Sequence, residues 1–424
     1  MIDNNNKNNL LMIAYHFPPQ GGSAALRPLK IAKYLPSFGW MPNILTVRNP
    51  DWYYAHDPEL LAELNPKIKI IKAPMFKSLW LYRMINPMRI EKFDNFIKRF
   101  LIHPDDQIGW LLFAYFYAIN TINKDNIKAI YSSSGPITCH LIAYLIKKQT
   151  NIPWIADFRD EWFEAPNNDM PTNIHIKFHL KIENMVVKNA DKIVCMAPVF
   201  VEFLKKHTND LKKFYTIPAG FDPDDIISIK KLNSNNKISK KFTLTFTGLF
   251  YNTFRPKALL QAVSELIAKG KIDRDKIKIK FVGGNSFSDL DYKDKFEICE
   301  FTGFLPRIKA LKHAAESNAL LLLLSSERGK DVIPSKIFEY LALKKPILGI
   351  VPINGEVANI IRKTRSGIVA DFDNVNEIKR AILELYNKWQ KNELHQKQDI
   401  KEINKYNQIN LVGKLAEILK DITD

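Results

Sequence analysis

The sequence predicts an α/β protein with two doubly wound, mostly parallel sheets, and three observations lead to this fold class. The chain has 424 residues, which is too long for one ordinary hydrophobic core and suits two domains of about 200 residues. Residues 10–15 are a short apolar strand, followed by a glycine loop and a helix over about 26–38, the usual opening of a doubly wound domain. Residues 320–351 then run as buried strand, polar loop, helix and strand.

Changes in pattern along the chain indicate where the domains end. Residues 1–222 contain the first series of strands and helices, and we expect them to form the first domain. Residues 223–240 are polar and show no periodicity, so we interpret them as a linker. The second domain is expected over 241–400, with a charged, helical end over 401–424.

Composition narrows the class of protein and its location. Hydrophobic residues make up 46% and charged residues 25%, as in soluble globular proteins. No apolar run approaches the 18 to 20 residues of a transmembrane helix, and the polar start is not a secretory signal, so we expect a cytoplasmic protein. The formal net charge of +17 favours an anionic partner such as nucleic acid, anionic lipid or a phosphorylated substrate.

The helix expected after Pro334 has the side chains of a nucleotide-diphosphate site. Lys336 falls within its first turn, where backbone N–H groups favour anions. Glu339 follows on the same helix, and Asp331 precedes it in the loop. The ammonium of Lys336 and the start of the helix suit a diphosphate, and a carboxylate such as that of Glu339 accepts hydrogen bonds from a ribose diol. A solvated helix face is the alternative for an acid and a lysine taken alone.

The wider motif resembles a known family. Ile333-Pro-Ser-Lys-x-x-Glu-Tyr-Leu-Ala, followed by Lys-Pro-Ile-Leu and Gly-Glu, is similar to the donor-binding region of family 4 glycosyltransferases. That family brackets the donor with two acids spaced E-x7-E. Glu339 fills the second position, and Asp331 stands at the first in place of glutamate.

The resemblance implies the GT-B fold, in which two Rossmann-like domains face each other across a cleft. It also implies transfer of a sugar from a nucleotide-diphosphate sugar, such as a UDP-sugar, with retention of anomeric configuration. No cofactor or metal is required in that chemistry. In such proteins the last helix, here within 401–424, packs back on the first domain.

Three further segments match the family's donor site. Phe17-Pro-Pro-x-Gly21-Gly22 resembles the first loop, which faces the cleft, and the loop with Gly303 and Phe304 resembles the one whose backbone meets the nucleotide base. After the strand ending at Gly248, Arg255 and Lys257 approximate the family's basic donor-binding pair. The alternative interpretation is that these glycines only permit turns and that the isolated basic side chains only face solvent.

Charged residues follow a buried strand in the first domain. Residues 152–156 are apolar, and Asp157-Phe-Arg159-Asp160 comes directly after them. The run PWIADFRDEW resembles a subgroup that acts in bacterial polysaccharide assembly, such as lipopolysaccharide or capsule synthesis. In that role Arg159 would bind a phosphate of a lipid-linked acceptor and Asp160 would orient the attacking hydroxyl. An Arg–Asp pair that only fixes a loop is the alternative. Some family members have His-Asp at Arg159-Asp160, so no catalytic histidine is assigned.

Residues 72–103 interleave basic and aromatic side chains. Such a mixture suits the interface of an anionic membrane, and on this basis we expect peripheral membrane association. Packing of the aromatic side chains within the domain is an alternative that explains the pattern equally well.

Three other functions compete with glycosyl transfer. A non-catalytic GT-B protein that binds sugars or serves as a scaffold accounts for Asp331 and Ala219, which stand where the family has Glu and usually Asn. A nucleotide-sugar epimerase would use the same donor site. A basic nucleic-acid-binding protein would explain the charge, but the sequence has no recognition motif of that class.

Overall fold

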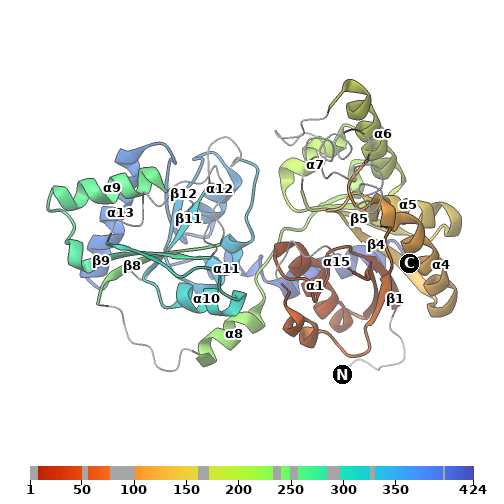
Figure 1. The fold of residues 1–424 in the computed structure, drawn as a ribbon, viewed down its shortest axis with the longest axis horizontal. Coiled ribbons are helices and arrows are strands. Elements are labelled where there is room, and N and C mark those ends of the chain that lie inside the picture. Colours follow the sequence, from red (N-terminus) through yellow and green to blue (C-terminus); the bar gives the residue numbers. More distant parts are fainter. Residues whose placement is uncertain are drawn as a thin grey trace, which may run out of the picture. The chain divides into compact units, whose positions relative to one another are not determined.

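The computed structural model describes residues 8–49, 56–76, 100, 102–160, 171–232, 240–248, 256–283, 297–324, 330–394 and 397–424. The chain divides into two compact units (Figure 1). Unit 1 consists of Met1–Pro218 and Gln408–Asp424, and unit 2 consists of Ala219–Asn407. The chain therefore leaves unit 1 once and returns to it for its last helix.

Unit 1 contains a seven-stranded parallel sheet in the order β3-β2-β1-β4-β5-β6-β7. Its strands are β1 (Asn8–Ile13), β2 (Trp40–Val47), β3 (Lys69–Ala73), β4 (Ile127–Ser133), β5 (Trp154–Phe158), β6 (Lys192–Cys195) and β7 (Phe214–Thr216). Four residues of β1 and all five of β5 are buried, because helices cover both faces of a parallel sheet. The strand order reverses between β1 and β4, the point where ligands bind in such sheets.

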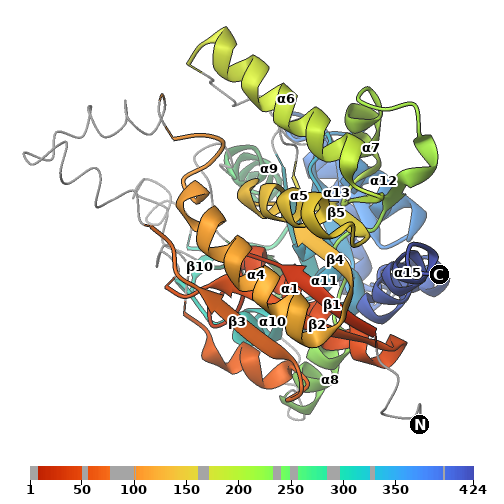
Figure 2. The same ribbon diagram turned by 90° about the vertical axis from the view of Figure 1, so that its right-hand side faces the viewer.

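Two layers of helices cover this sheet. Helices α4 and α5 lie side by side on one face (Figure 2), and α1 and α15 share a hydrophobic cluster on the other. The helices of unit 1 are α1 (Ser23–Tyr34), α4 (Leu111–Asp125), α5 (Thr138–Thr150), α6 (Asn173–Asn189), α7 (Pro198–Lys205) and α15 (Gln408–Asp421), with short 3-10 turns at Leu35–Phe38, Pro58–Glu63, Ile108–Trp110 and Leu211–Lys213.

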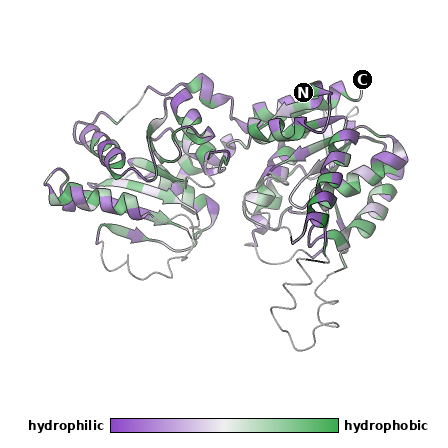
Figure 3. Cartoon of the chain, turned by 90° about the horizontal axis from the view of Figure 1, so that it is seen from above, coloured by the Kyte–Doolittle hydropathy of each residue, from purple (hydrophilic) through white to green (hydrophobic). Residues whose placement is uncertain are grey.

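Unit 2 contains a six-stranded parallel sheet in the order β10-β9-β8-β11-β12-β13. Its strands are β8 (Phe242–Thr247), β9 (Ile277–Val282), β10 (Cys299–Phe301), β11 (Ala319–Leu323), β12 (Ile347–Ile350) and β13 (Gly367–Ala370). Its helices are α8 (Pro223–Leu232), α9 (Lys257–Ala268), α10 (Arg307–Ala315), α11 (Lys336–Leu343), α12 (Glu356–Lys363), α13 (Val375–Gln390) and α14 (Ile400–Asn404), with a 3-10 turn at Arg274–Lys276. Apolar strands run through the centre of the unit and polar helix faces lie outside (Figure 3).

The sheets confirm the predicted doubly wound α/β class, and the strand–helix–strand order over 320–351 is present as β11, α11 and β12. The interval 223–240 differs from the expected linker, because α8 occupies Pro223–Leu232. Proline at the first position and Asp224 and Asp225 in the first turn favour this helix. The structure does not describe 233–239.

Within the described ranges, none of the helices combines the length and the apolar character that crossing a membrane requires.

Candidate functional site

Three glycines at the carboxyl ends of neighbouring strands form a surface without side chains, which we call the glycine shelf. Gly248 follows β8, Gly283 follows β9 and Gly303 lies after β10, with φ of +117°, +155° and +70°. A Cβ built on Gly283 would lie 2.0 Å from the carbonyl oxygen of Gly248. Gly283 also donates its N–H to the carbonyl of Gly303 at 3.1 Å. Only glycine fits this contact, so the backbones of the two strand ends pack directly against each other.

The ammonium of Lys336 lies against this shelf. Its Nζ is 3.9 Å from the centroid of the Phe246 ring and 2.8 Å from the position of a Cβ on Gly248. Burial lowers the pKa of Lys336 to about 8, against the opposing effect of the Glu339 carboxylate. Among the residues that the structure describes, no hydrogen bond or ion pair satisfies this ammonium. An anion bound at the shelf would do so.

Helix α11 is fixed to the end of β8 by a buried tyrosine. The hydroxyl of Tyr340 accepts a hydrogen bond from the Thr247 N–H at 2.9 Å and lies 3.4 Å from the carbonyl oxygen of Leu321. Burial raises the pKa of Tyr340, so the hydroxyl stays neutral. Lys336 and Glu339 are three residues apart on this helix and therefore share a face. The tyrosine thus sets where that face meets the shelf.

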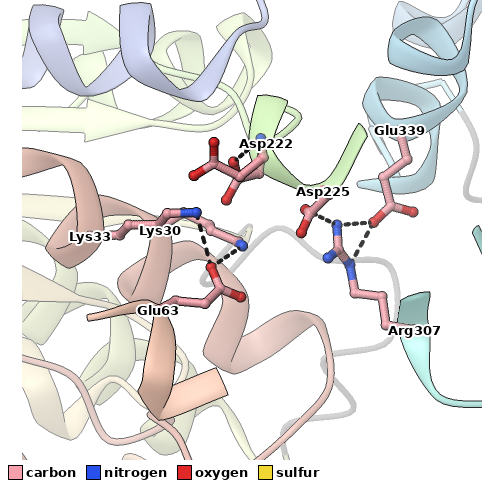
Figure 4. Close-up of polar contacts among 8 residues, drawn as sticks. Lys30, Lys33, Glu63, Asp222, Asp225, Arg307 and Glu339 are labelled. Carbon is pink, nitrogen blue, oxygen red and sulfur yellow. Dashed lines mark hydrogen bonds and ion pairs between the residues drawn. The ribbon is translucent and has the colours of Figure 1, made fainter. Parts of the chain in front are cut away.

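Glu339 is part of an ion network within unit 2. Its Oε1 accepts from Arg307 Nε at 2.9 Å and from Arg307 Nη2 at 2.8 Å (Figure 4). The same Nη2 donates to Asp225 Oδ2 at 2.8 Å. Burial alone would lower the pKa of Arg307, but the two carboxylates outweigh it and raise that pKa. The solvated helix face that was the sequence-based alternative is therefore not what surrounds Glu339, whose side chain is 17% exposed.

The other predicted donor residues are placed as follows. Asp331 lies in a turn before α11 and has no hydrogen-bond or ion-pair partner among the described residues. Lys257 is the exposed first residue of α9. Phe304 is 64% exposed beside Gly303 of the shelf. Arg255 lies outside the described residues. Over the described ranges, no group of three His, Cys, Asp or Glu side chains is arranged to hold a metal ion.

In unit 1, the charges after β5 point to the start of α1. Arg159 donates from Nη1 to the carbonyl of Ala24 at 2.7 Å, and its backbone N–H donates to Ser134 Oγ at 3.0 Å. Its buried Nε has no hydrogen-bond partner among the described residues. Asp160 is exposed, with a carboxylate oxygen 3.9 Å from the Cβ position on Gly135. Arg159 therefore fixes the loop after β5 to the start of α1, and its Nε–H is the donor that these contacts do not use.

The glycines of the first loop differ from each other. Gly21 is buried, whereas Gly22 is exposed, has φ of +87° and is the N-cap residue of α1. The positive φ at Gly22 lets the chain enter the helix. Both lie in unit 1.

A buried ion pair holds this end of the unit 1 sheet. Arg27 of α1 donates to both carboxylate oxygens of Asp157, at 2.9 and 2.7 Å. Tyr131 and Ser133 donate to the same carboxylate at 2.6 and 3.1 Å. Burial favours the neutral acid, but Arg27 more than offsets it and the pKa of Asp157 is lowered. In the sequence both residues stand close to motifs described above, but no pattern there indicates that they contact each other.

His16 is a further titratable side chain of unit 1 that the sequence analysis did not single out. It follows β1, and its Nδ1 is 3.0 Å from Gln20 Oε1. Burial lowers the pKa of His16, the hydrogen bond to Gln20 opposes this, and Arg159 lowers it further. Its place after the first strand, just before the glycine loop, was the available signal.

Comparison with known proteins agrees with this geometry. Residues 228–404 match the family model described as glycosyl transferases group 1. Sucrose-phosphate synthase from Thermosynechococcus elongatus aligns with a TM-score of 0.66 at 12% identity, over 98% of this chain and 99% of that one. Anabaena HepE in complex with UDP and glucose aligns with a TM-score of 0.63 at 12% identity, over 98% and 100%. A glycosyltransferase from Rickettsia africae aligns with a TM-score of 0.64 at 17% identity, over 98% and 99%.

The fold is GT-B. The two parallel α/β units correspond to the two Rossmann-like domains of these structures. The family match adds that the second domain of this GT-B chain, which carries the shelf, is similar to glycosyltransferases. No curated protein sequence matches the chain.

Proposed function

We propose that this GT-B protein is a glycosyltransferase that moves a sugar from a nucleotide-diphosphate sugar to an acceptor hydroxyl. The observation that carries the proposal is the half-buried Lys336 ammonium, which lies at the glycine shelf with no hydrogen-bond or ion-pair partner among the described residues. A cation drawn partly out of water without a partner is costly unless a ligand supplies the opposite charge. The family match of residues 228–404 supports the same class of reaction.

The transfer breaks the bond between the anomeric carbon and the diphosphate oxygen. The acceptor oxygen attacks that carbon and loses its proton, and the nucleoside diphosphate leaves with the bonding electron pair. Lys336 and the N-terminus of α11 stabilise the negative charge on the leaving group. Lys257 and Arg255 add positive charge, Asp331 contacts the donor sugar, and Phe304 with Gly303 meets the base. Retention of configuration and independence from metal follow from the resemblance to family 4.

Unit 1 provides the acceptor side in this proposal. Arg159 has one buried N–H without a partner in the part of the chain that the structure describes, which suits a phosphate of a lipid-linked acceptor. The exposed carboxylate of Asp160 follows it and orients the attacking hydroxyl. Gly21 and Gly22 present backbone N–H groups. The pathway in this proposal is bacterial polysaccharide assembly, such as lipopolysaccharide or capsule synthesis.

The protein works in the cytoplasm at an anionic membrane surface in this proposal. Most of the segment 72–103, which suggested the membrane, lies outside the described residues. Support comes instead from the exposed side chains of Ile174 and Phe178, at 77% and 43%, which alternate with exposed Lys177 and Lys181 on α6. A lysine-bearing apolar stripe suits anionic lipid.

A thermal-shift screen with UDP-, GDP- and dTDP-sugars tests the donor, since a ligand of the native state stabilises it. We expect one nucleotide class to raise the Tm of the wild type, and Glu339→Gln to weaken that shift and transfer while remaining folded. Asp160→Asn should keep the donor shift and slow transfer only.

The outcomes separate the competing functions. Binding without turnover would favour a sugar-binding or scaffold protein, and interconversion of the free donor would favour an epimerase. A chain that no nucleotide sugar stabilises, but that binds nucleic acid with a steep salt dependence, would overturn the proposal.

A further inference from the structure

We propose that Arg307 is a positioning residue of the donor site, which holds one carboxylate oxygen of Glu339 so that the other faces the ribose hydroxyls. The inference rests on the proposed function, because it needs a nucleotide at the shelf. It assigns a role to a residue that no sequence motif indicated.

The geometry of the contact is asymmetric. Arg307 directs both Nε and Nη2 to Oε1 of Glu339, at 2.9 and 2.8 Å. Oε2 of Glu339 has no partner among the described residues (Figure 4). A carboxylate whose two oxygens were bridged by a fork of arginine donors would have little capacity left in that plane. Here one oxygen is saturated, and the other keeps its acceptor capacity.

The arginine is itself held in place from the opposite side. Asp225 Oδ2 accepts from the same Nη2 at 2.8 Å. The side chains of Asp225, Glu339 and Arg307 are 9%, 17% and 22% exposed. They belong to α8, α11 and α10, so three helices of unit 2 fix the network. Partial burial makes such charge-assisted bonds stronger than they are at the surface.

Pre-positioning explains why an arginine is useful there. A glutamate side chain has three rotatable bonds, and ordering it when the ligand binds costs affinity. Arg307 makes that ordering part of the folded state. Without it, Glu339 would also lie near Asp225 with no cation between them, and like charges repel. The carboxylate would then turn away from the ligand.

The rival interpretation is that the network only joins three helices. Both interpretations expect lower stability when Arg307 is replaced, so Tm does not separate them. Recognition of the ribose 2′-hydroxyl separates the two interpretations. A hydrogen bond from a hydroxyl to a charged acceptor contributes about tenfold or more in affinity.

The experiment measures calorimetric affinities of the full chain for UDP and 2′-deoxy-UDP, and for GDP and 2′-deoxy-GDP. For the wild type we expect the ribonucleotide of the preferred base to bind about tenfold or more tightly than its deoxy analogue. Arg307→Gln should reduce this ratio to within about threefold. The matched control is Asp225→Asn, which keeps the shape of the network and should lower Tm while keeping the ratio of the wild type.

Each contrary result has one meaning. An unchanged ratio in Arg307→Gln, or an equal loss in Asp225→Asn, overturns the positioning role and leaves the donor site intact. A wild type that binds ribo and deoxy forms equally overturns the ribose contact alone. A wild type that binds none of the four nucleotides overturns the proposed function together with this inference. If Arg307→Gln does not fold, the double variant Asp225→Asn/Arg307→Gln removes both opposite charges and gives the same readout.

Discussion

At the scale of single residues, the unit 2 site depends on a half-buried ammonium. Lys336 is stacked on Phe246, and the missing side chain of Gly248 makes room for it. Burial lowers the pKa of Lys336 to about 8, with Glu339 opposing. In the free protein, the charge that a diphosphate needs is therefore lost at mildly alkaline pH.

Nucleotide affinity should follow this titration. Because the charged form binds the diphosphate, the affinity of UDP or GDP should be constant well below pH 8 and fall about tenfold per pH unit above it. Lys336→Met should bind weakly at every pH, without that slope. The stability of the free protein should change in the opposite direction. The pKa of Lys336 in the folded protein lies below the ordinary lysine value of 10.5, so the free energy of unfolding should increase as pH rises from about 8 to 10.5. A pH series of calorimetric titrations measures the nucleotide affinity, and a wild-type affinity that does not change with pH would contradict the predicted titration of Lys336.

At the scale of elements, two helices of unit 1 expose apolar side chains near their N-terminal ends. Leu112 and Phe116 of α4 are 65% and 62% exposed, and Ile174 of α6 is 77% exposed. Phe178 of α6 packs edge-on near His103, with ring centroids 6.4 Å apart. Exposed apolar groups on several helices of one unit are more than a scattered surface leucine. Of these residues, Ile174 and Phe178 form the stripe assigned above to anionic lipid, together with Lys177 and Lys181 of α6.

We expect the wild type to cosediment with vesicles that contain anionic lipid and not with purely zwitterionic ones. The double variant Ile174→Ser/Phe178→Ser should lose most of this binding, because it removes the inserted apolar area while keeping the charge. Leu211→Ser is the matched control, since Leu211 is an exposed apolar residue, 55% exposed, outside the stripe. Equal loss in the control, or equal binding to both vesicle types, would argue against the stripe.

At the scale of the whole chain, unit 1 is completed by the end of the sequence. Leu411, Val412, Leu415 and Leu419 of α15 lie in the same buried cluster as Leu10 and Met12 of β1. Gly413 allows close packing, because a Cβ there would be 3.1 Å from the Phe38 ring. The first domain therefore lacks part of its core until the last residues are present.

Leu415→Ala should destabilise unit 1 by about 2–5 kcal/mol, the usual cost of removing a buried leucine side chain. Hydrogen exchange should show faster exchange in β1 and β2, with β8 and β11 of unit 2 unchanged. Exposed Lys414→Ala, on the same helix, should change neither. Faster exchange in both units would mean that they unfold as one cooperative body.

Elements whose signals are local could be predicted from the sequence alone. Strand β11, helix α11 and strand β12 were predicted because apolar periodicity and proline position act within a few residues. The sequence pattern also placed Lys336 and Glu339 on one helix. Helix α8 was missed although proline and two aspartates mark its start, because its polar surroundings favoured a linker.

Only the tertiary structure decided what these residues contact. Glu339 meets Arg307 across 32 positions and Arg307 meets Asp225 across 82, and ion pairs at that separation leave no periodic pattern in a sequence. The glycine shelf has the same origin, since Gly248, Gly283 and Gly303 become neighbours only when β8, β9 and β10 pair in parallel. Local chemistry selects the element, and packing between distant elements selects its partners.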